Sequence, residues 1–93
     1  MEIELNDFLK INNPNIIDIR SLEKYNEQHI PNSININYSL LITNPEEYLN
    51  KNETYYIYCQ KGITSKKVVQ MLKVRGYKVI SIIGGYEKYI LQT

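Results

Sequence analysis

The 93-residue sequence contains no tryptophan, one cysteine and one histidine. A single cysteine excludes an internal disulfide framework and any cysteine-rich zinc site. A single histidine argues equally against a histidine-based metal centre, so we expect neither a metal ion nor an organic cofactor. The chain also lacks an apolar run approaching the roughly 18 residues that cross a bilayer, so we expect no membrane association.

The sequence also lacks an excess of positive or negative charge. Eleven Lys and Arg residues stand against ten Asp and Glu residues, which leaves a formal net charge of +1. No long basic run or strongly basic face is visible, so nucleic acid is not expected as a partner. The first residues, 1–4, have neither the basic region nor the apolar stretch of a signal peptide, and we therefore expect a soluble, cytoplasmic protein.

Glycine and proline are few, with four and three residues respectively, and no segment rich in them divides the chain. Apolar residues make up 43% of the sequence and charged residues 23%, which are ordinary values for a globular protein. No internal repeat or low-complexity segment is visible. We therefore expect one compact domain that spans residues 1–93.

Short apolar, β-branched runs alternate with helical patterns along the chain. Such runs suggest strands that are covered on both faces, as in a parallel sheet. The strands are expected at residues 16–19, 55–58 and 79–83, with weaker candidates at 33–36 and 1–5. Helices are expected at 6–11, 22–28, from 45 onward, at 65–75 and at 85–91. This alternation predicts an α/β domain with a mainly parallel sheet.

Cys59 directly follows one of these buried strands, at the place where parallel sheets collect ligands. A short loop containing Gly62 then leads to a helix that is expected to begin at Thr64 or Ser65. Gly62 permits a positive φ, which allows backbone N–H groups to turn inward. The helix adds unpaired N–H groups and the positive end of its dipole. The sequence therefore predicts an anion-binding loop around a thiol that ionises readily.

The side chains of this loop suit an anionic sulfur. Lys61 supplies a positive charge fitted to a small anionic sulfur donor such as thiosulfate, and Thr64 is a candidate hydroxyl donor to the sulfur. A persulfide anion on Cys59 would be held by the same N–H groups. Structural explanations also stand: a buried apolar cysteine, a solvated lysine, and hydroxyl caps of the helix at Thr64 and Ser65.

Several separated segments resemble one family. The loop from Cys59 to Thr64 resembles the six-residue active-site loop of the rhodanese-like sulfurtransferases, in the Lys-Gly-hydrophobic-Thr form of thiosulfate-using members. Residues 16–20 resemble the family's apolar-Asp-apolar-Arg signature, and residues 25–31 its Tyr-x-x-x-His-Ile-Pro element. Residues 84–89 are similar to its Gly-Gly-x-x-x-Trp ending, with Tyr89 in place of Trp. On these segments the chain is identified as a member of this family, of the single-domain thiosulfate sulfurtransferase type.

The resemblance implies a three-layer domain whose central sheet has about five strands flanked by helices. It implies that Cys59 is the nucleophile that carries a persulfide, and that Lys61 helps to bind the sulfonate of the donor. The acceptor is then cyanide in an assay, and a thiol or a partner protein in the cell. The rest of the expected active-site and substrate-binding loop is Gln60, Gly62, Ile63, Thr64 and Ser65.

Three residues outside the loop are candidate supporting groups. Asp18 is expected to accept backbone N–H bonds at the end of a strand. Arg20 either pairs with an acid such as Glu23 or faces the pocket. His29 is expected to be a hydrogen-bonded scaffold residue, because persulfide transfer needs little base when the thiol is already ionised. Gln60 occupies a position that is often Arg in thiosulfate-using members, which leaves the sulfur donor open.

Two other functions remain open at this point. A rhodanese-like module that docks partners or relays sulfur without catalysis would have the same fold, although the presence of Cys59 argues against it. Small phosphatases and arsenate reductases of this fold use a longer loop ending in Arg, which grips a tetrahedral oxyanion. The loop here ends in Thr64 and Ser65 and contains no Arg, so sulfur transfer is favoured.

Overall fold

The computed structural model describes residues 1–93 and contains five strands, five α-helices and one short 3₁₀ helix. The strands are β1 (Glu2–Ile3), β2 (Asn15–Asp18), β3 (Ile34–Asn35), β4 (Thr54–Tyr58) and β5 (Lys78–Ile82). The helices are α1 (Leu5–Phe8), α2 (Leu22–Glu27), α3 (Tyr38–Thr43), α4 (Ile63–Val74) and α5 (Gly85–Gln92), with the 3₁₀ helix η1 at Pro45–Glu47.

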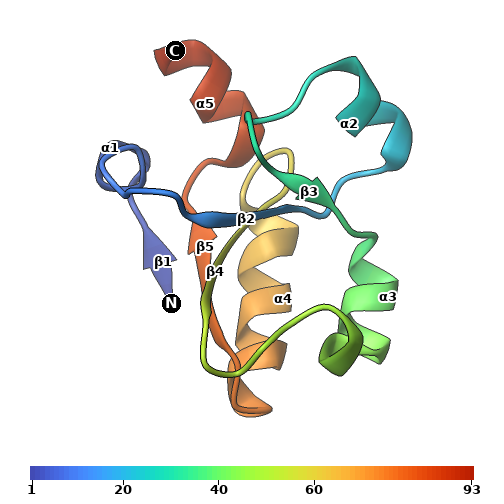
Figure 1. Ribbon diagram of the computed structural model, residues 1–93. Coiled ribbons are helices and arrows are strands. Elements are labelled where there is room, and N and C mark those ends of the chain that lie inside the picture. The colour runs from blue at the N-terminus through green and yellow to red at the C-terminus, as the bar shows by residue number, and fades with distance from the viewer.

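All five strands form one parallel sheet in the order β1-β5-β4-β2-β3 (Figure 1). β4 lies in the middle, where Ile57 pairs with Ile17 of β2 on one side and with Ser81 of β5 on the other. A central strand of a parallel sheet is covered on both faces, which explains its near-continuous apolar sequence. The predicted α/β domain with a mainly parallel sheet of about five strands is therefore confirmed.

Helices α3 and α4 cover one face of the sheet, as Figure 1 shows. Leu41 of α3 and Leu72 of α4 are fully buried against Ile57 of β4. The apolar residues of α4 recur at helical spacing and so form one buried stripe, whose members are Val68, Val69 and Leu72. This face contains the larger of the two apolar clusters.

Helices α1 and α5 cover the opposite face. Phe8 of α1 and Tyr86 of α5 belong to one buried cluster with Tyr58 of β4. Tyr58 and Ile57 are neighbours in the chain, and successive side chains of a strand point to opposite faces. One strand thus contributes to both clusters, and the domain has three layers.

The helical predictions are correct in part. Ser21 caps α2 as expected, because its Oγ accepts the backbone N–H of Lys24 at 3.2 Å. The helix expected from Pro45 is only the three-residue η1. Helix α3 was not predicted, although the Asn37 side chain accepts the N–H of Ser39 at 2.8 Å and so marks its start.

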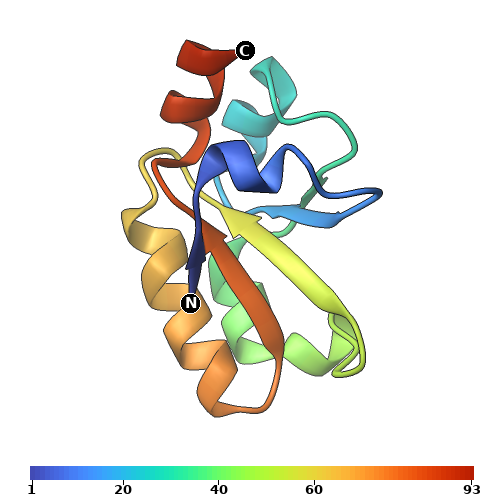
Figure 2. The ribbon, with the colours of Figure 1, turned by 90° about the vertical axis from the view of Figure 1, so that its left-hand side faces the viewer.

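The carboxyl ends of β2, β4 and β5 lie at the same edge of the sheet, and α2 and α5 stand together beyond that edge (Figure 2). The Tyr86 hydroxyl of α5 donates to the side-chain carbonyl of Gln28, just after α2, at 3.1 Å. The loop that follows β4 begins at this edge, so the fold surrounds it with the segments that follow β2 and β5. None of the helices combines the length and the apolar character needed to cross a membrane.

We expect α4 to stabilise the domain mainly through its buried apolar stripe. Val69→Ala removes two methyl groups from a fully buried site and should lower the free energy of unfolding by about 2–3 kcal/mol. Val74→Ala makes the same chemical change on the same helix at a residue that is 88% exposed, and should change it by less than ~0.5 kcal/mol. Urea unfolding measures both, and equal losses would contradict this packing.

Candidate active site

The sulfur of Cys59 lies just beyond β4, surrounded by backbone donors. The N–H of Gly62 donates to Sγ at 3.1 Å and the N–H of Ser65 at 3.3 Å. The residue is only 7% exposed, yet it lines a pocket of about 290 Å³ with Gln60, Lys61, Ile63 and Thr64. The sulfur is therefore held among amides at the base of an opening.

Four further N–H groups of this loop make no hydrogen bond within the protein. They belong to the four residues that line the pocket beside Cys59, namely Gln60, Lys61, Ile63 and Thr64. Two of them are in the first turn of α4, where helix geometry leaves N–H groups without internal partners. The pocket thus offers several free donors and the positive end of a helix dipole to an anion.

Helix α5 turns the loop into this conformation. The N–H of Tyr86 donates to the carbonyl oxygen of Cys59 at 2.9 Å, and the N–H of Glu87 to that of Gln60 at 3.0 Å. In a planar trans peptide the C=O and the N–H point in opposite directions. Because both carbonyls face α5, the N–H groups of Gln60 and Lys61 face away from it.

Glycines make this contact between loop and helix possible. Gly85 has a φ of +60°, and a Cβ there would overlap the carbonyl oxygen of Cys59 and lie 2.8 Å from Gly62 N. Gly62 has a φ of +89°, and its Cβ would lie 2.8 Å from Gly84 N. Sequence reasoning did not assign this role to residues 84–85, although two glycines directly after a strand were the available signal.

The hydroxyl beside the sulfur is that of Ser65, which lies 3.4 Å from Sγ. Thr64 is exposed and its hydroxyl makes no hydrogen bond with Cys59. The helix begins at Ile63 and its N-cap residue is Gly62, so the expectation that Thr64 and Ser65 are caps is wrong. The positive φ of Gly62 allows α4 to start earlier, which places Ser65 inside the first turn.

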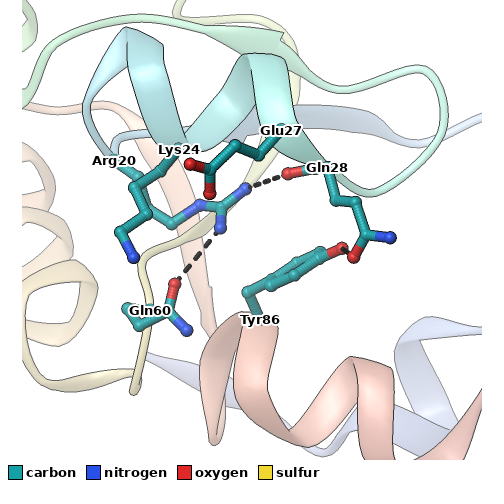
Figure 3. A pocket seen from close by; sticks show the side chains of 6 residues that line it. All are labelled: Arg20, Lys24, Glu27, Gln28, Gln60 and Tyr86. Atoms are coloured by element: carbon teal, nitrogen blue, oxygen red, sulfur yellow. Dashed lines mark hydrogen bonds between the residues drawn. The ribbon is translucent and has the colours of Figure 1, made fainter.

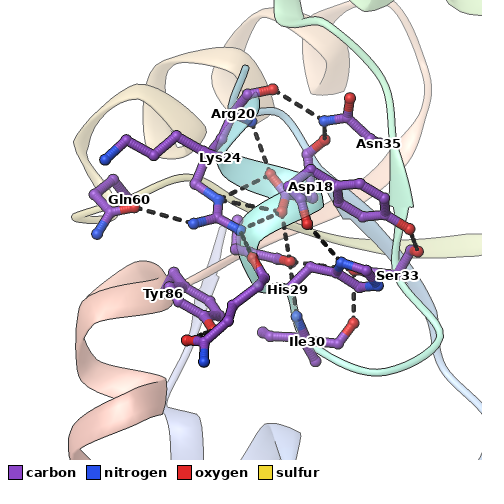
Figure 4. Close-up of polar contacts among 12 residues, drawn as sticks. Asp18, Arg20, Lys24, His29, Ile30, Ser33, Asn35, Gln60 and Tyr86 are labelled. Atoms are coloured by element: carbon purple, nitrogen blue, oxygen red, sulfur yellow. Dashed lines mark hydrogen bonds and ion pairs between the residues drawn. The ribbon is translucent and has the colours of Figure 1, made fainter. Parts of the chain in front are cut away.

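Asp18 and Arg20 form a buried ion pair at the end of β2, with Nη2 and Oδ2 2.8 Å apart (Figure 4). As predicted, Asp18 also accepts a backbone N–H, that of Arg20, at 2.8 Å. Arg20 therefore pairs with Asp18 and not with Glu23. Burial opposes the guanidinium charge, but the hydrogen bonds and the negative charge of Asp18 outweigh it and raise the pKa of Arg20.

The hydroxyl of Tyr58 extends this network across the sheet. It donates to Oδ2 of Asp18 at 2.7 Å and accepts the N–H of Ile30 at 3.1 Å. It also lies 3.1 Å from the hydroxyl of Ser33. Burial, reinforced by the carboxylate of Asp18, raises the pKa of the Tyr58 phenol far above its ordinary value. The neutral phenol thus ties the end of β4, directly before Cys59, to β2 and to residues 30–33.

A second pocket, of about 350 Å³, shares Gln60 with the Cys59 pocket. Figure 3 shows its lining. Its lining consists of Arg20, Lys24, Glu27, Gln28, Gln60 and Tyr86. The guanidinium of Arg20 lies 4.2 Å from the centre of the Tyr86 ring, and its Nη1 donates to Oε1 of Gln60 at 3.2 Å. Arg20 therefore faces a pocket, but it reaches the Cys59 loop only through Gln60. An arginine at position 60 would bring a second guanidinium next to that of Arg20, and the two positive charges would repel.

His29 has a structural setting, as expected. Its Nδ1 lies 2.7 Å from the backbone carbonyl of Tyr25, and its ring stacks on the Tyr25 ring with 3.8 Å between centres. It lines neither the Cys59 pocket nor the pocket of Arg20. Of the three candidate supporting residues, Asp18 and Arg20 lie together beside the loop, and His29 does not line it.

The parallel sheet and the short loop that holds a thiol among N–H donors define an α/β domain with a cysteine-centred anion pocket, and comparison with known proteins identifies its family. The rhodanese-like domain family model matches residues 3–92. The chain therefore belongs to the rhodanese-like domain family.

Individual relatives are similar over most of the chain. Thiosulfate sulfurtransferase GlpE of Coxiella burnetii is 36% identical over 75 residues, which are 80% of this chain and 69% of GlpE. The adenylyltransferase and sulfurtransferase uba4 of Ogataea parapolymorpha is 34% identical over 85% of this chain but only 21% of its own length. A rhodanese-like domain protein from Staphylococcus aureus is 33% identical, with a TM-score of 0.80 over 94% of this chain and 89% of its own.

The contact between the loop and α5 can be tested with two glycine variants. Gly85→Ala should displace the loop, because its Cβ would overlap the carbonyl oxygen of Cys59. Gly76→Ala is the matched control, since Gly76 has a φ of +94° but a Cβ there would meet only the Lys51 side chain, at 3.5 Å. We expect Gly85→Ala to lose about 1–3 kcal/mol more stability than Gly76→Ala in chemical unfolding. Equal losses of stability would show that backbone strain alone explains the effect of Gly85→Ala, without any overlap with the loop.

Proposed function

We propose that this protein is a sulfurtransferase that carries sulfane sulfur as a persulfide on Cys59. The observation that supports this proposal best is the pocket in which Cys59 lies. Two N–H groups donate to its Sγ, and the four residues that line the pocket beside it have N–H groups without partners. Donors directed at one site favour negative charge on whatever sulfur occupies it. A thiolate, a persulfide and a sulfonate all meet that requirement.

The proposed reaction has two half-reactions. The Cys59 thiolate attacks the outer sulfur of thiosulfate, the S–S bond of the donor breaks, and sulfite leaves with the electron pair. The enzyme then holds Cys59 as a persulfide anion. In the second half-reaction a nucleophilic acceptor, cyanide in an assay or a thiol in the cell, attacks the terminal sulfur. The bond to Sγ breaks, and its electron pair returns to Sγ as thiolate.

In this proposal the loop residues have different roles in binding the donor. The N–H groups of Gln60, Lys61 and Ile63 receive the sulfonate or the terminal sulfur, and the charge of Lys61 attracts the donor to the pocket. Gln60 adds no charge, so Lys61 is the only cationic residue in the lining of the Cys59 pocket. The Asp18–Arg20 pair supports the loop from behind through Gln60. The resemblance to GlpE, a thiosulfate sulfurtransferase by name, supports thiosulfate as the first donor to test.

One alternative has an observation of its own. The match to uba4 covers about a fifth of that protein, which is how a domain that hands sulfur to a partner within a larger enzyme would match. In that case Cys59 would accept sulfur from a protein donor and relay it, with little turnover of small molecules. Phosphatase or arsenate reductase chemistry is disfavoured, because no arginine lines the Cys59 pocket to hold a tetrahedral oxyanion.

The proposal first predicts that a persulfide forms on Cys59. After treatment with thiosulfate, the wild-type protein should gain about 32 Da, the mass of one sulfur atom, and should convert cyanide to thiocyanate. Cys59→Ser should show neither the mass gain nor turnover, because no other thiol is present. Intact-protein mass spectrometry and a thiocyanate assay measure the two. A wild-type protein that takes up no sulfur from thiosulfate, polysulfide or a persulfide would refute the proposal, whereas uptake without turnover would favour the relay.

The role of Lys61 is a separate prediction. Lys61→Gln should raise KM for thiosulfate about three- to tenfold, with a smaller change in kcat, because the variant loses the charge that draws the dianion into the pocket. Lys73→Gln is the control, since Lys73 lies in the last turn of α4, at the opposite end from the loop. Steady-state kinetics at fixed ionic strength give both constants. An unchanged KM in Lys61→Gln would mean that this lysine is only a solvated surface charge.

A further inference from the structure

Two buried serines lie on the core side of the Cys59 loop. Ser65 of α4 and Ser81 of β5 are both fully buried, with their Oγ atoms 2.8 Å apart. Oγ of Ser65 is also 3.4 Å from Sγ of Cys59. The three groups thus form a row of hydrogen bonds from β5 through α4 to the sulfur. Ser81 has no other side-chain hydrogen bond.

This arrangement is unusual for the middle of a parallel sheet. Ser81 pairs in register with Ile57 of β4 and is flanked in β5 by Ile80 and Ile82, where apolar residues are the rule. A buried hydroxyl without a partner costs about 1–3 kcal/mol. Ser81 avoids that penalty only by bonding to Ser65, and through Ser65 it is linked to the sulfur.

The number of hydroxyl protons determines in which direction the hydrogen bonds between Ser81, Ser65 and Cys59 run. When Cys59 is a thiolate, Ser81 donates to Ser65 and Ser65 donates to Sγ, so that both hydroxyl protons are used. When a thiol donates to Ser65 instead, the two hydroxyls share a single hydrogen bond between them, and one hydroxyl proton makes no hydrogen bond. The pair therefore stabilises negative charge on Sγ more than it stabilises the thiol.

We propose that Ser81 is a positioning residue that directs the Ser65 hydroxyl toward Sγ of Cys59. The inference rests on the proposed sulfur transfer and separates two sets of donors. The N–H groups of Gln60, Lys61 and Ile63 hold the outer sulfur, and the serine pair adds to the N–H groups of Gly62 and Ser65 at the inner one. When an acceptor attacks the terminal sulfur, the S–S bond breaks and its electron pair moves onto Sγ. The serine pair stabilises that developing charge, so it promotes the release of sulfur.

The test uses release of sulfur from the preloaded persulfide to cyanide, followed in a single turnover. Ser65→Ala should slow this step about tenfold or more and Ser81→Ala about three- to tenfold. The double variant should be no slower than Ser65→Ala alone, because Ser81 acts only through Ser65. Additive losses in the double variant, or a normal rate in Ser81→Ala, would overturn the inference.

A second measurement separates positioning from packing. The pH at which Cys59 becomes half-reactive toward iodoacetamide should rise in Ser81→Ala and stay unchanged in Ser33→Ala. Ser33 is also buried, but its hydroxyl donates to the carbonyl of Ile30, away from the sulfur. Ser81→Thr and Ser81→Val form an isosteric pair should Ser81→Ala fail to fold, and only the threonine should keep the wild-type midpoint. Equal midpoints in that pair would also overturn the inference.

The two proposals fail in different ways. The charged groups around the loop, Lys61 and the Asp18–Arg20 pair, together with Lys66 of α4 and Glu87 of α5, are the same in every serine variant. A wild-type protein that takes up no sulfur would refute sulfur transfer, while the alkylation midpoints would still report on the serine pair. A wild-type protein that transfers sulfur normally, with serine variants that match it, would refute only the serine pair.

Discussion

The hydrogen bonds between the first turn of α5 and the loop after β4 are the interaction on which the site depends. Tyr86 and Glu87 bind the carbonyl oxygens of Cys59 and Gln60, and planar peptides then direct the following N–H groups to the other side. Without that contact, a short loop would be free to point carbonyl oxygens at the sulfur and repel an anion. Gly62 and Gly85 allow the two backbones to approach closely enough for these bonds.

The network of Asp18, Arg20 and Tyr58 has a complementary function, because it joins the carboxyl ends of two neighbouring strands. Asp18 is fully buried, and its charge is balanced by Arg20 and by the Tyr58 hydroxyl. Removal of one partner from such a network would leave a buried charge unpaired, which is strongly destabilising. The same Arg20 holds the side chain of Gln60, so that the scaffold and the rim of the Cys59 pocket are mechanically connected. Gln60 thereby combines a position next to the nucleophile with a scaffold contact.

Sequence reasoning was most reliable where the pattern is local and repeated. The apolar, β-branched runs identified β2, β4 and β5 to within a few residues, the weaker candidates corresponded to β1 and β3, and the apolar stripe of α4 identified its buried face. It was less reliable where a tertiary contact determines the local structure. Helix α3 was not predicted because its six residues bury only Leu41. The caps at Thr64 and Ser65 were predicted from residue type, whereas the N-cap residue is Gly62 and the helix begins at Ile63.

The sequence by itself determined the class of fold, the position of the one cysteine after a central strand, and the short loop that leads from it into a helix. These follow from the periodicity of side chains and from turn residues, which are properties of neighbours in the chain. Only the tertiary structure decided that Asp18 is the partner of Arg20, that Gly85 accommodates the Cys59 carbonyl, and that Ser81 reaches the sulfur through Ser65. The contacts of Gly85 and Ser81 join different elements, and no local pattern specifies which distant residue packing and buried hydrogen bonding will bring there. Asp18 and Arg20 are only two residues apart, and it is their common burial beside the loop that pairs them.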